Sequence, residues 1–262
     1  MSATVSRHST SLLAGLCLIA IAAPAAQRDS LILRAGESVE RFWDQYSAFT
    51  CVEEVVQRKT EPNGKVIVQR KTTYDYLILL QNSGGELLVE ESRLLQGKAP
   101  KETDRALLAT SGFSTLLLIL HPIFRESFAF SIEPHFEMAP GNTVPVRFRH
   151  IKGRPSPSAL QLRTRTYPIE WQGTAWIDPE SGRIARIQAE LPGPMEDVGM
   201  QKLSSDVRYA PLTADRGSIW LPQTAVIEAA TRRQRWNNLH SFSRYRKFTV
   251  DTEVKIEEPP KP

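Results

Sequence analysis

Few residues of this chain have the types and spacing that chemistry requires. Beyond the first residues, the histidines are His121, His135, His150 and His240, and none has a second His, a Cys or a carboxylate at the spacing of a metal motif such as H-E-x-x-H. The sequence contains no G-x-S-x-G elbow, no P-loop and no G-x-G-x-x-G loop. An isolated histidine is usually a surface or capping residue, so the pattern predicts no metal, no cofactor and no catalytic residue.

Cys51 and two glutamate pairs are the remaining chemical candidates. Cys51 lies in an alternating apolar and polar stretch, which favours a small buried core residue over a nucleophile. Glu53 and Glu54 are adjacent, as are Glu90 and Glu91, so each pair points to opposite faces of a strand. Neither pair therefore suits a two-carboxylate hydrolase, whose groups converge on one bond. A hydrolase with a site assembled from distant strands stays open as an alternative.

The N-terminus has the pattern of an export signal. Arg7 precedes an apolar run from Leu12 to Ala23, and the small residues Ala23-Pro24-Ala25-Ala26 follow. The run of about 12 residues is shorter than the ~20 that span a bilayer. We expect a signal peptide over residues 1–26, cleavage near Ala25–Gln27, and a periplasmic or secreted protein; an uncleaved membrane anchor is the alternative.

Basic residues gather in two acid-free stretches, although the formal net charge is only +4. No Asp or Glu occurs between Glu137 and Glu170, or between Glu228 and Asp251. Solvated strand faces would explain this, but so would a surface for an anionic partner such as lipid head groups or an acidic protein. Export makes nucleic acid the least expected of these anionic partners, and we expect none. The second stretch supplies four candidate head-group ligands: Arg232, Arg233, Arg244 and Arg246.

The apolar pattern first predicts a helix and then a series of strands. Over residues 30–49, Val39, Phe42 and Trp43 recur at helical spacing. A period of two follows, with strands over 50–59, 65–81 and 86–95 joined by short turns, the first at Asn63-Gly64. A second helical region over 107–124 is expected to end at His121-Pro122.

The second half of the chain reads as further antiparallel strands. Strands are expected over 127–132, 144–151, 160–171, 202–209, 218–232 and 241–254, with a turn at 236–239. A hairpin is expected over 173–191, with its turn at 178–182. Pro222 suggests an edge strand or a bulge. We expect an α+β fold: a large curved antiparallel sheet, a half-barrel of about ten strands, with two helical segments covering its concave face. One domain over 27–256 and a frayed tail over 257–262 complete the layout.

This order of elements resembles the family of periplasmic outer-membrane lipoprotein carriers and their relatives. The hairpin from Gly173 to Arg186 and the strand Ser218-Ile-Trp-Leu-Pro222 look like motifs of that family, and Phe49–Glu54 and Tyr245–Val250 resemble exported bacterial proteins with the same layout. The resemblance implies an unclosed half-barrel, an apolar cavity for acyl chains and no catalytic residues.

We therefore expect a non-enzymatic exported protein that holds an apolar or acylated ligand, a lipid or a lipoprotein, between sheet and helices. Burial of apolar surface would drive binding. The predicted lining residues are Phe42, Trp43, Leu117, Ile177 and Ile187, with the four arginines at the rim. Peripheral membrane contact is compatible with this function. The main alternative is an envelope module that binds a protein partner, such as a stress sensor.

Overall fold

The structure is a computed structural model that describes residues 22–45, 48–83, 86–97, 113–132, 142–162, 165–212 and 220–247. The expected tail over 257–262 lies outside the described residues. So do residues 1–21 of the expected signal peptide and the beginning of the predicted helical region over 107–124.

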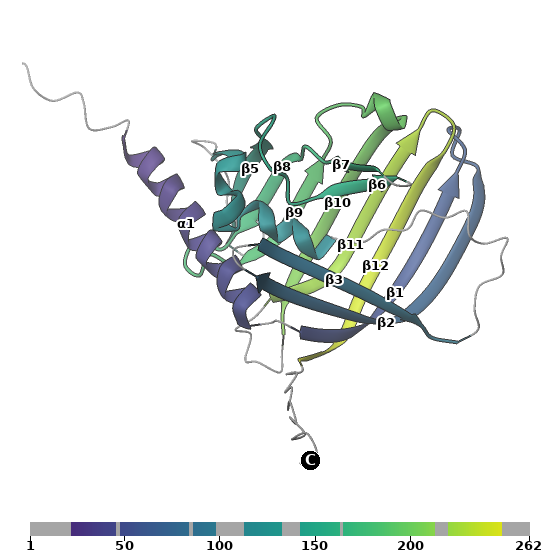
Figure 1. The fold of residues 1–262 in the computed structure, drawn as a ribbon, viewed down its shortest axis with the longest axis horizontal. Helices are drawn as coiled ribbons and strands as arrows, with labels where there is room; N and C mark the ends of the chain where they lie inside the picture. The colour runs from purple at the N-terminus through teal and green to yellow at the C-terminus, as the bar shows by residue number, and fades with distance from the viewer. Residues whose placement is uncertain are drawn as a thin grey trace, which may run out of the picture.

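One large antiparallel sheet dominates the molecule (Figure 1). Its ten strands are ordered β3-β2-β1-β12-β11-β10-β9-β8-β5-β4. Their bounds are β1 (Ala48–Thr60), β2 (Val66–Ser83), β3 (Glu86–Leu95), β4 (Phe128–Ser131), β5 (Val144–His150), β8 (Gln172–Ile177), β9 (Ile184–Glu190), β10 (Met200–Pro211), β11 (Trp220–Thr231) and β12 (Arg235–Lys247). The first and last of these strands, β1 and β12, are neighbours. The predicted antiparallel sheet of about ten strands is confirmed.

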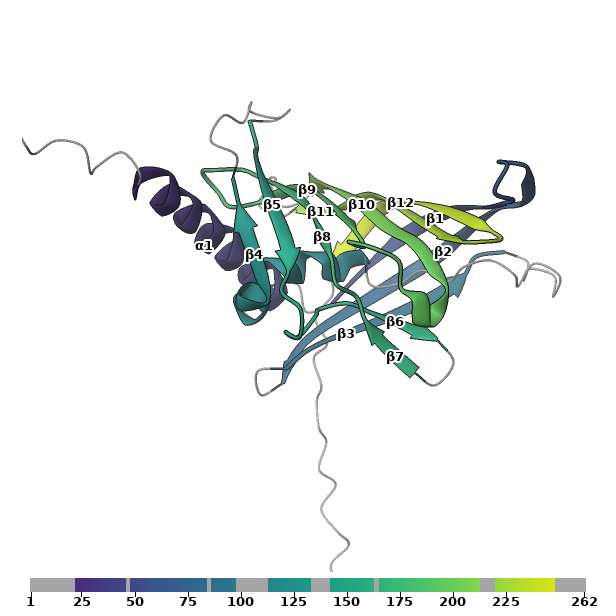
Figure 2. The ribbon, with the colours of Figure 1, turned by 90° about the horizontal axis from the view of Figure 1, so that it is seen from above.

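The sheet is open, with β3 and β4 as its edges, and it is twisted rather than strongly curled (Figure 2). The expected half-barrel curvature is therefore wrong. Bulges bend a sheet where they interrupt its strands. Here the register shifts fall near strand ends, for example at Thr50/Val52 and Lys59/Thr60 of β1 and at Trp176/Ile177 of β8. The strand interiors stay regular, and the sheet keeps only its ordinary twist.

Among the described residues, the helical cover is one α-helix and two short 3-10 helices rather than two comparable helices. α1 (Ala22–Gln45) begins earlier than the predicted helix over 30–49. It also ends earlier, because β1 already starts at Ala48. The second region forms η2 (Phe113–Ile119) and η3 (Pro122–Ser127). The predicted break at His121-Pro122 is confirmed: Pro122 opens η3, and His121 Nδ1 accepts a hydrogen bond from the backbone N–H of Ile123 at 3.2 Å.

Three local predictions need correction. The expected strand over 160–171 is a separate small hairpin of β6 (Ala159–Leu162) and β7 (Arg165–Pro168). The turn before β12 lies at 232–234, not at 236–239, because the Thr231 hydroxyl accepts from the backbone N–H of Gln234 and closes it earlier. Pro222 lies at a register shift but in a central strand, so the bulge is confirmed and the edge is wrong.

The core lies between one face of the sheet and the helical elements. Alternate residues of β1 point inward, and α1 lies at one end of the sheet with η2 and η3 between it and the strands (Figures 1 and 2). Residues 116–120 of η2 and its end are all buried, so side chains fill most of the space between helices and sheet. A cavity remains at the end of the sheet beside α1.

Candidate ligand-binding site

A buried charged cluster links three strands of the inner face. Glu53 of β1 is fully buried and accepts hydrogen bonds from His240 Nδ1 of β12 at 2.7 Å and from Arg93 of β3, whose Nη2 lies 3.1 Å from Glu53 Oε1. The Arg93 guanidinium also lies over the Tyr76 ring, 4.3 Å from its centroid. Burial alone would raise the pKa of Glu53, but the hydrogen bonds from His240 and Arg93 outweigh it and lower the pKa. Glu53 is thus ionised, and its carboxylate is bound by side chains of two other strands, β12 and β3.

Cys51 lies on the same strand face, two residues before Glu53. Burial, with a smaller contribution from the Glu53 charge, raises the pKa of its thiol to about 12. The thiol is therefore protonated at neutral pH, whereas a nucleophilic cysteine needs a low pKa. The interpretation of Cys51 as a core residue agrees with its 3% exposure.

A cavity of about 390 Å³ opens where α1 meets the sheet. Its apolar walls come from five elements of the fold: Val39 and Phe42 of α1, Leu117 of η2, Ile184 of β9, Tyr209 of β10 and Trp220 of β11. The volume lies within the range of small-molecule sites, about 300–1,000 Å³.

The β8–β9 hairpin closes one side of this cavity. Asp178 Oδ1 accepts hydrogen bonds from the backbone N–H of Ser181 at 2.7 Å and of Glu180 at 3.2 Å, which fixes the predicted turn. Gly182 has a φ of +71°, and a Cβ there would lie 2.4 Å from the carbonyl oxygen of Arg34. Glycine is thus required twice over, by its backbone conformation and by the close approach of the turn to α1.

Polar groups share the lining of the cavity with these apolar walls. Arg34 and Arg41 of α1 and Arg183 of the hairpin contribute three positive charges, and Glu37 and Glu180 contribute two negative ones. Arg41 lies 3.9 Å from Glu37. The Tyr209 side chain is buried, and its hydroxyl has no hydrogen-bond partner among the described residues.

The five predicted apolar residues divide into two groups. Phe42 and Leu117 line the cavity. Trp43, Ile177 and Ile187 are buried at 3% exposure or less and belong to the packed core around it. Trp43 Nε1 donates to the Gln81 carbonyl oxygen at 3.3 Å, which ties α1 to β2.

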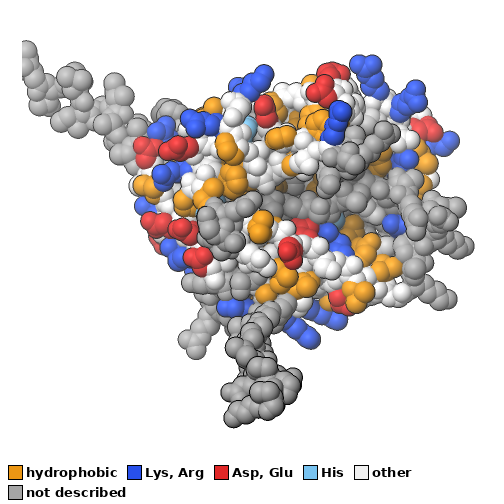
Figure 3. Space-filling view, viewed as in Figure 1, with side chains coloured by type: hydrophobic (Ala, Val, Ile, Leu, Met, Phe, Trp, Pro, Cys, Tyr) orange, Lys and Arg blue, Asp and Glu red, His pale blue; other side chains and the backbone are white. Residues whose placement is uncertain are grey.

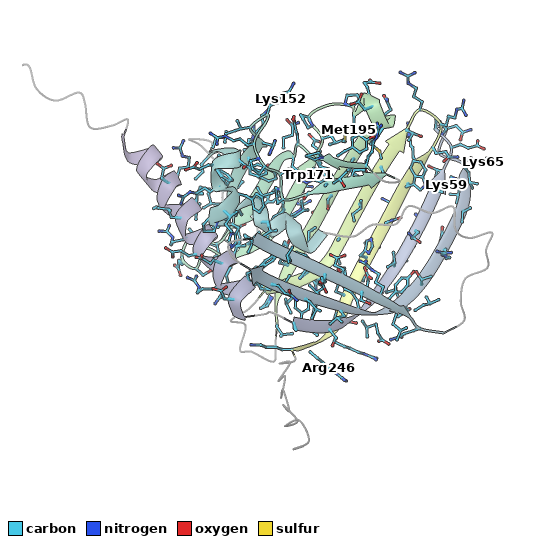
Figure 4. All side chains as sticks on the ribbon, in the orientation of Figure 1. Lys59, Lys65, Lys152, Trp171, Met195 and Arg246 are labelled. Carbon is cyan, nitrogen blue, oxygen red and sulfur yellow. The ribbon has the colours of Figure 1, made fainter. Side chains whose placement is uncertain are left out.

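The four predicted arginines do not form one site. Arg232 and Arg233 lie at the β11–β12 turn, whereas Arg244 and Arg246 lie at the other end of β12, near its pairing with Phe49 and Thr50. At about 3.3 Å per residue the two pairs are roughly 35 Å apart, so they cannot hold a common head group. Figure 4 shows this separation, with Lys59 beside the turn end and Arg246 at the opposite end.

The charged residues of the cavity come from parts of the chain that the acid-free stretches do not include. One signal was available in the sequence: Arg34, Ser38 and Arg41 recur at i, i+4 and i+7, which places a polar stripe beside the apolar stripe of the same helix. The contribution of Tyr209 and Arg183 depends on strand pairing and had no local signal.

Fold and cavity together define an open-sheet β protein with a partly open cavity at one end of the sheet. No family model matches the chain, and no curated protein matches it. Two solved structures are similar, each covering 87% of this chain and 95% of its own: a DUF1329 family protein from Desulfovibrio piger, with a TM-score of 0.44 and 10% identity, and a putative outer membrane lipoprotein-sorting protein domain from Vibrio parahaemolyticus, with 0.38 and 11%.

Among the described residues, no helix combines the length and apolarity needed to cross a membrane.

Proposed function

We propose that the mature chain is an exported, non-catalytic binding protein, one domain over residues 27–256, that holds an apolar or acylated ligand in the cavity beside α1. The observation that carries this proposal is the cavity of about 390 Å³ with walls formed by Val39, Phe42 and Leu117 among others. Contact with such walls removes apolar ligand surface from water, which contributes about 25 cal/mol for each Å².

Cleavage of a signal peptide would leave the residues of this cavity in place. α1 begins at Ala22, so cleavage near Ala26 removes only its first residues. The cavity residues of α1 begin at Arg34, and the mature chain retains all of them.

The charged cluster supports a structural rather than a catalytic role for its members. Glu53 and His240 are 0% and 2% exposed, and both belong to a network that joins β1, β3 and β12. A reacting group has to reach its substrate within hydrogen-bond distance. The cavity beside α1 is lined by other residues.

Membrane contact is assigned in this proposal to the opposite end of the sheet. There Arg232, Arg233 and Lys65 are exposed beside Val66 and Ile67, which are 50% and 46% exposed. Figure 3 shows Lys and Arg side chains gathered at this end, at the upper right of the view. Glu61, Glu196 and Asp197 lie at or near the same turns and moderate the charge. Basic side chains with exposed aliphatic ones suit a surface of anionic lipids.

The test is native mass spectrometry of the protein purified from the envelope of its own host. A co-purifying acyl species, displaced in a Ser38→Trp variant, is the expected result, because Ser38 lines the cavity and a large ring would fill it. Glu40→Trp is the matched control, since Glu40 is exposed on the same helix and does not line the cavity. Empty protein that captures one envelope protein would instead favour the protein-binding alternative.

A further inference from the structure

A second groove, of about 650 Å³, lies at the end of the sheet opposite α1, between the short 3-10 helix η4 (Glu196–Val198) and the β11–β12 turn (Figure 1). Its lining comes from η4 and the start of β10, from the turn itself, and from the start of β12. Three of the lining residues are charged: Arg232, Arg233 and Glu196. None of these residues takes part in the cavity beside α1.

The two arginines occupy the tip of a turn that its own hydrogen bonds hold. The Thr231 hydroxyl accepts from the backbone N–H of Gln234 at 3.2 Å, and the backbone N–H of Thr231 donates to the Gln234 carbonyl oxygen at 2.9 Å. Arg232 and Arg233 are both exposed, and neither has an ion pair with a carboxylate in the described part of the chain. Two adjacent guanidinium groups are thus positioned at the groove with no protein anion bound to them there.

The charge of the groove suits a monoanion. Arg232 and Arg233 against Glu196 leave a net charge of one positive unit in the lining. Lys59 of β1 lies close by, with its ammonium 6.0 Å from the centre of the Trp236 ring, and Trp236 is itself a lining residue. An anion in the groove is therefore attracted by more cations than it is repelled by acids.

Two guanidinium groups suit a phosphate group better than a carboxylate. The two oxygens of a carboxylate lie in one plane, and the fork of a single guanidinium group donates to both of them. The oxygens of a phosphate group diverge from the phosphorus atom, so two guanidinium groups can donate to it from different directions. A phosphodiester carries a single negative charge, which the net charge of the lining balances.

The place of the groove in the fold favours a lipid as the source of this phosphate. Thr60 of β1 pairs with Arg235 of β12 on one side and with Val66 of β2 on the other, so the two turns at this end are neighbours. Val66 and Ile67 are 50% and 46% exposed. Exposed aliphatic side chains beside basic ones are typical of a surface that enters the interface of a bilayer.

We propose that this groove binds the phosphodiester head group of a glycerophospholipid, whose phosphate oxygens accept hydrogen bonds from the guanidinium groups of Arg232 and Arg233. The assignment rests on the membrane contact in the proposed function and adds the chemical class of the head group. The glycerol part lies against Trp236 and Val198, which supply apolar surface to the lining.

The experiment is isothermal titration calorimetry of the mature protein with three probes. Dihexanoyl phosphatidylglycerol, used below the concentration at which it forms micelles, supplies the head group and short chains. Dihexanoylglycerol has the same chains without the phosphate, and inorganic phosphate lacks the lipid. We expect the phospholipid to bind at least about tenfold more tightly than either of the other probes, because hydrogen bonds to a charged group are the stronger kind.

Four variants locate the contact. Arg232→Gln and Arg233→Gln should each weaken binding of the phospholipid at least about fivefold. Arg235→Gln is the matched control, because Arg235 is exposed beside the same turn and does not line the groove; it should bind as the unmodified protein does. Glu196→Gln should bind more tightly, since it removes a negative charge from the lining.

An equal loss in Arg235→Gln would indicate a diffuse basic surface and overturn the groove as a site. Dihexanoylglycerol that binds as tightly as the phospholipid would overturn the role of the phosphate, and inorganic phosphate that does so would overturn the lipid. Loss of phospholipid binding in Ser38→Trp would place the lipid in the cavity beside α1, which overturns this inference and supports the proposed function. Absence of binding by all three probes would overturn this inference alone, because native mass spectrometry tests the cavity beside α1 separately.

Discussion

His240 Nδ1 donates to Glu53 Oε1 at 2.7 Å, although the two residues are 187 positions apart in the chain. The pairing of β1 with β12 makes this contact possible, because Glu53 lies opposite Phe242 and His240 lies opposite Val55, which places both side chains on the inner face. Arg93 reaches the same carboxylate from the edge strand β3. The cluster therefore joins strands from both ends of the chain and from an edge of the sheet.

Replacing Glu53 should destabilise the fold strongly. Among the described residues, Glu53→Gln leaves the Arg93 charge only the longer contact to Glu91, at 3.5 Å, and breaking a buried ion pair on one side costs about 3 kcal/mol or more. The measurement is the free energy of unfolding in urea. Glu54→Gln is the control, because Glu54 is more exposed, points to the opposite face and pairs with Lys71 at the surface, so its loss should cost about 1 kcal/mol or less. Equal losses in the two variants would show that the cluster contributes no more than a surface pair.

The same cluster should make stability depend on acid. The pKa of Glu53 in the folded protein is below its ordinary value of 4.5, so the unfolded chain binds the proton more readily. The stabilisation is fully present well above pH 4.5 and is lost as the pH falls below that value through the folded-state pKa. Unfolding measured between neutral pH and pH 3 should show a shallower acid decline for Glu53→Gln than for the unmodified protein. Parallel curves would assign the acid sensitivity to other carboxylates.

Removing the Tyr209 hydroxyl should stabilise the empty protein. The group is buried without a partner among the described residues, so Tyr209→Phe relieves a cost of about 1 kcal/mol. Thermal unfolding of the protein measures this, and we expect a higher Tm for the variant. A lower Tm would mean that the hydroxyl serves the fold.

Charge reversal should locate the membrane contact. We expect Arg232→Glu with Arg233→Glu to reduce sedimentation with phosphatidylglycerol vesicles by at least about tenfold, because each basic residue near an anionic surface contributes about 1 kcal/mol. Arg244→Glu with Arg246→Glu is the matched control at the other end of β12, and it should bind as before. A larger loss in the control pair would place the membrane contact at the cavity end.

Much of the fold was predictable because its signals are local. The turns at Asn63-Gly64 and Asp178–Gly182 and the period of two on either side fixed the strands around them. The curvature of the sheet depends on where bulges fall, and these positions have no signature in a single sequence. The formation of η2 as a short 3-10 helix in a tightly packed interior has no such signature either.

The candidate site was predictable only in part, because it is assembled by long-range pairing. Phe42 and Leu117 belong to apolar helical stretches and were found from periodicity. Arg34 and Tyr209 contribute to the lining of one cavity only because the fold brings α1 to the ends of β9, β10 and β11. Arg232 and Arg244 are near in sequence but are separated by the length of β12, so their grouping from sequence was wrong.

A crystal structure with ω-bromododecanoate would show whether the cavity beside α1 holds the ligand. Anomalous scattering locates the bromine without reference to the side chains. We expect one bromine position within the cavity lined by Val39, Leu117 and Ile184. Bromine bound on the outer face of the sheet, with the cavity empty, would contradict it.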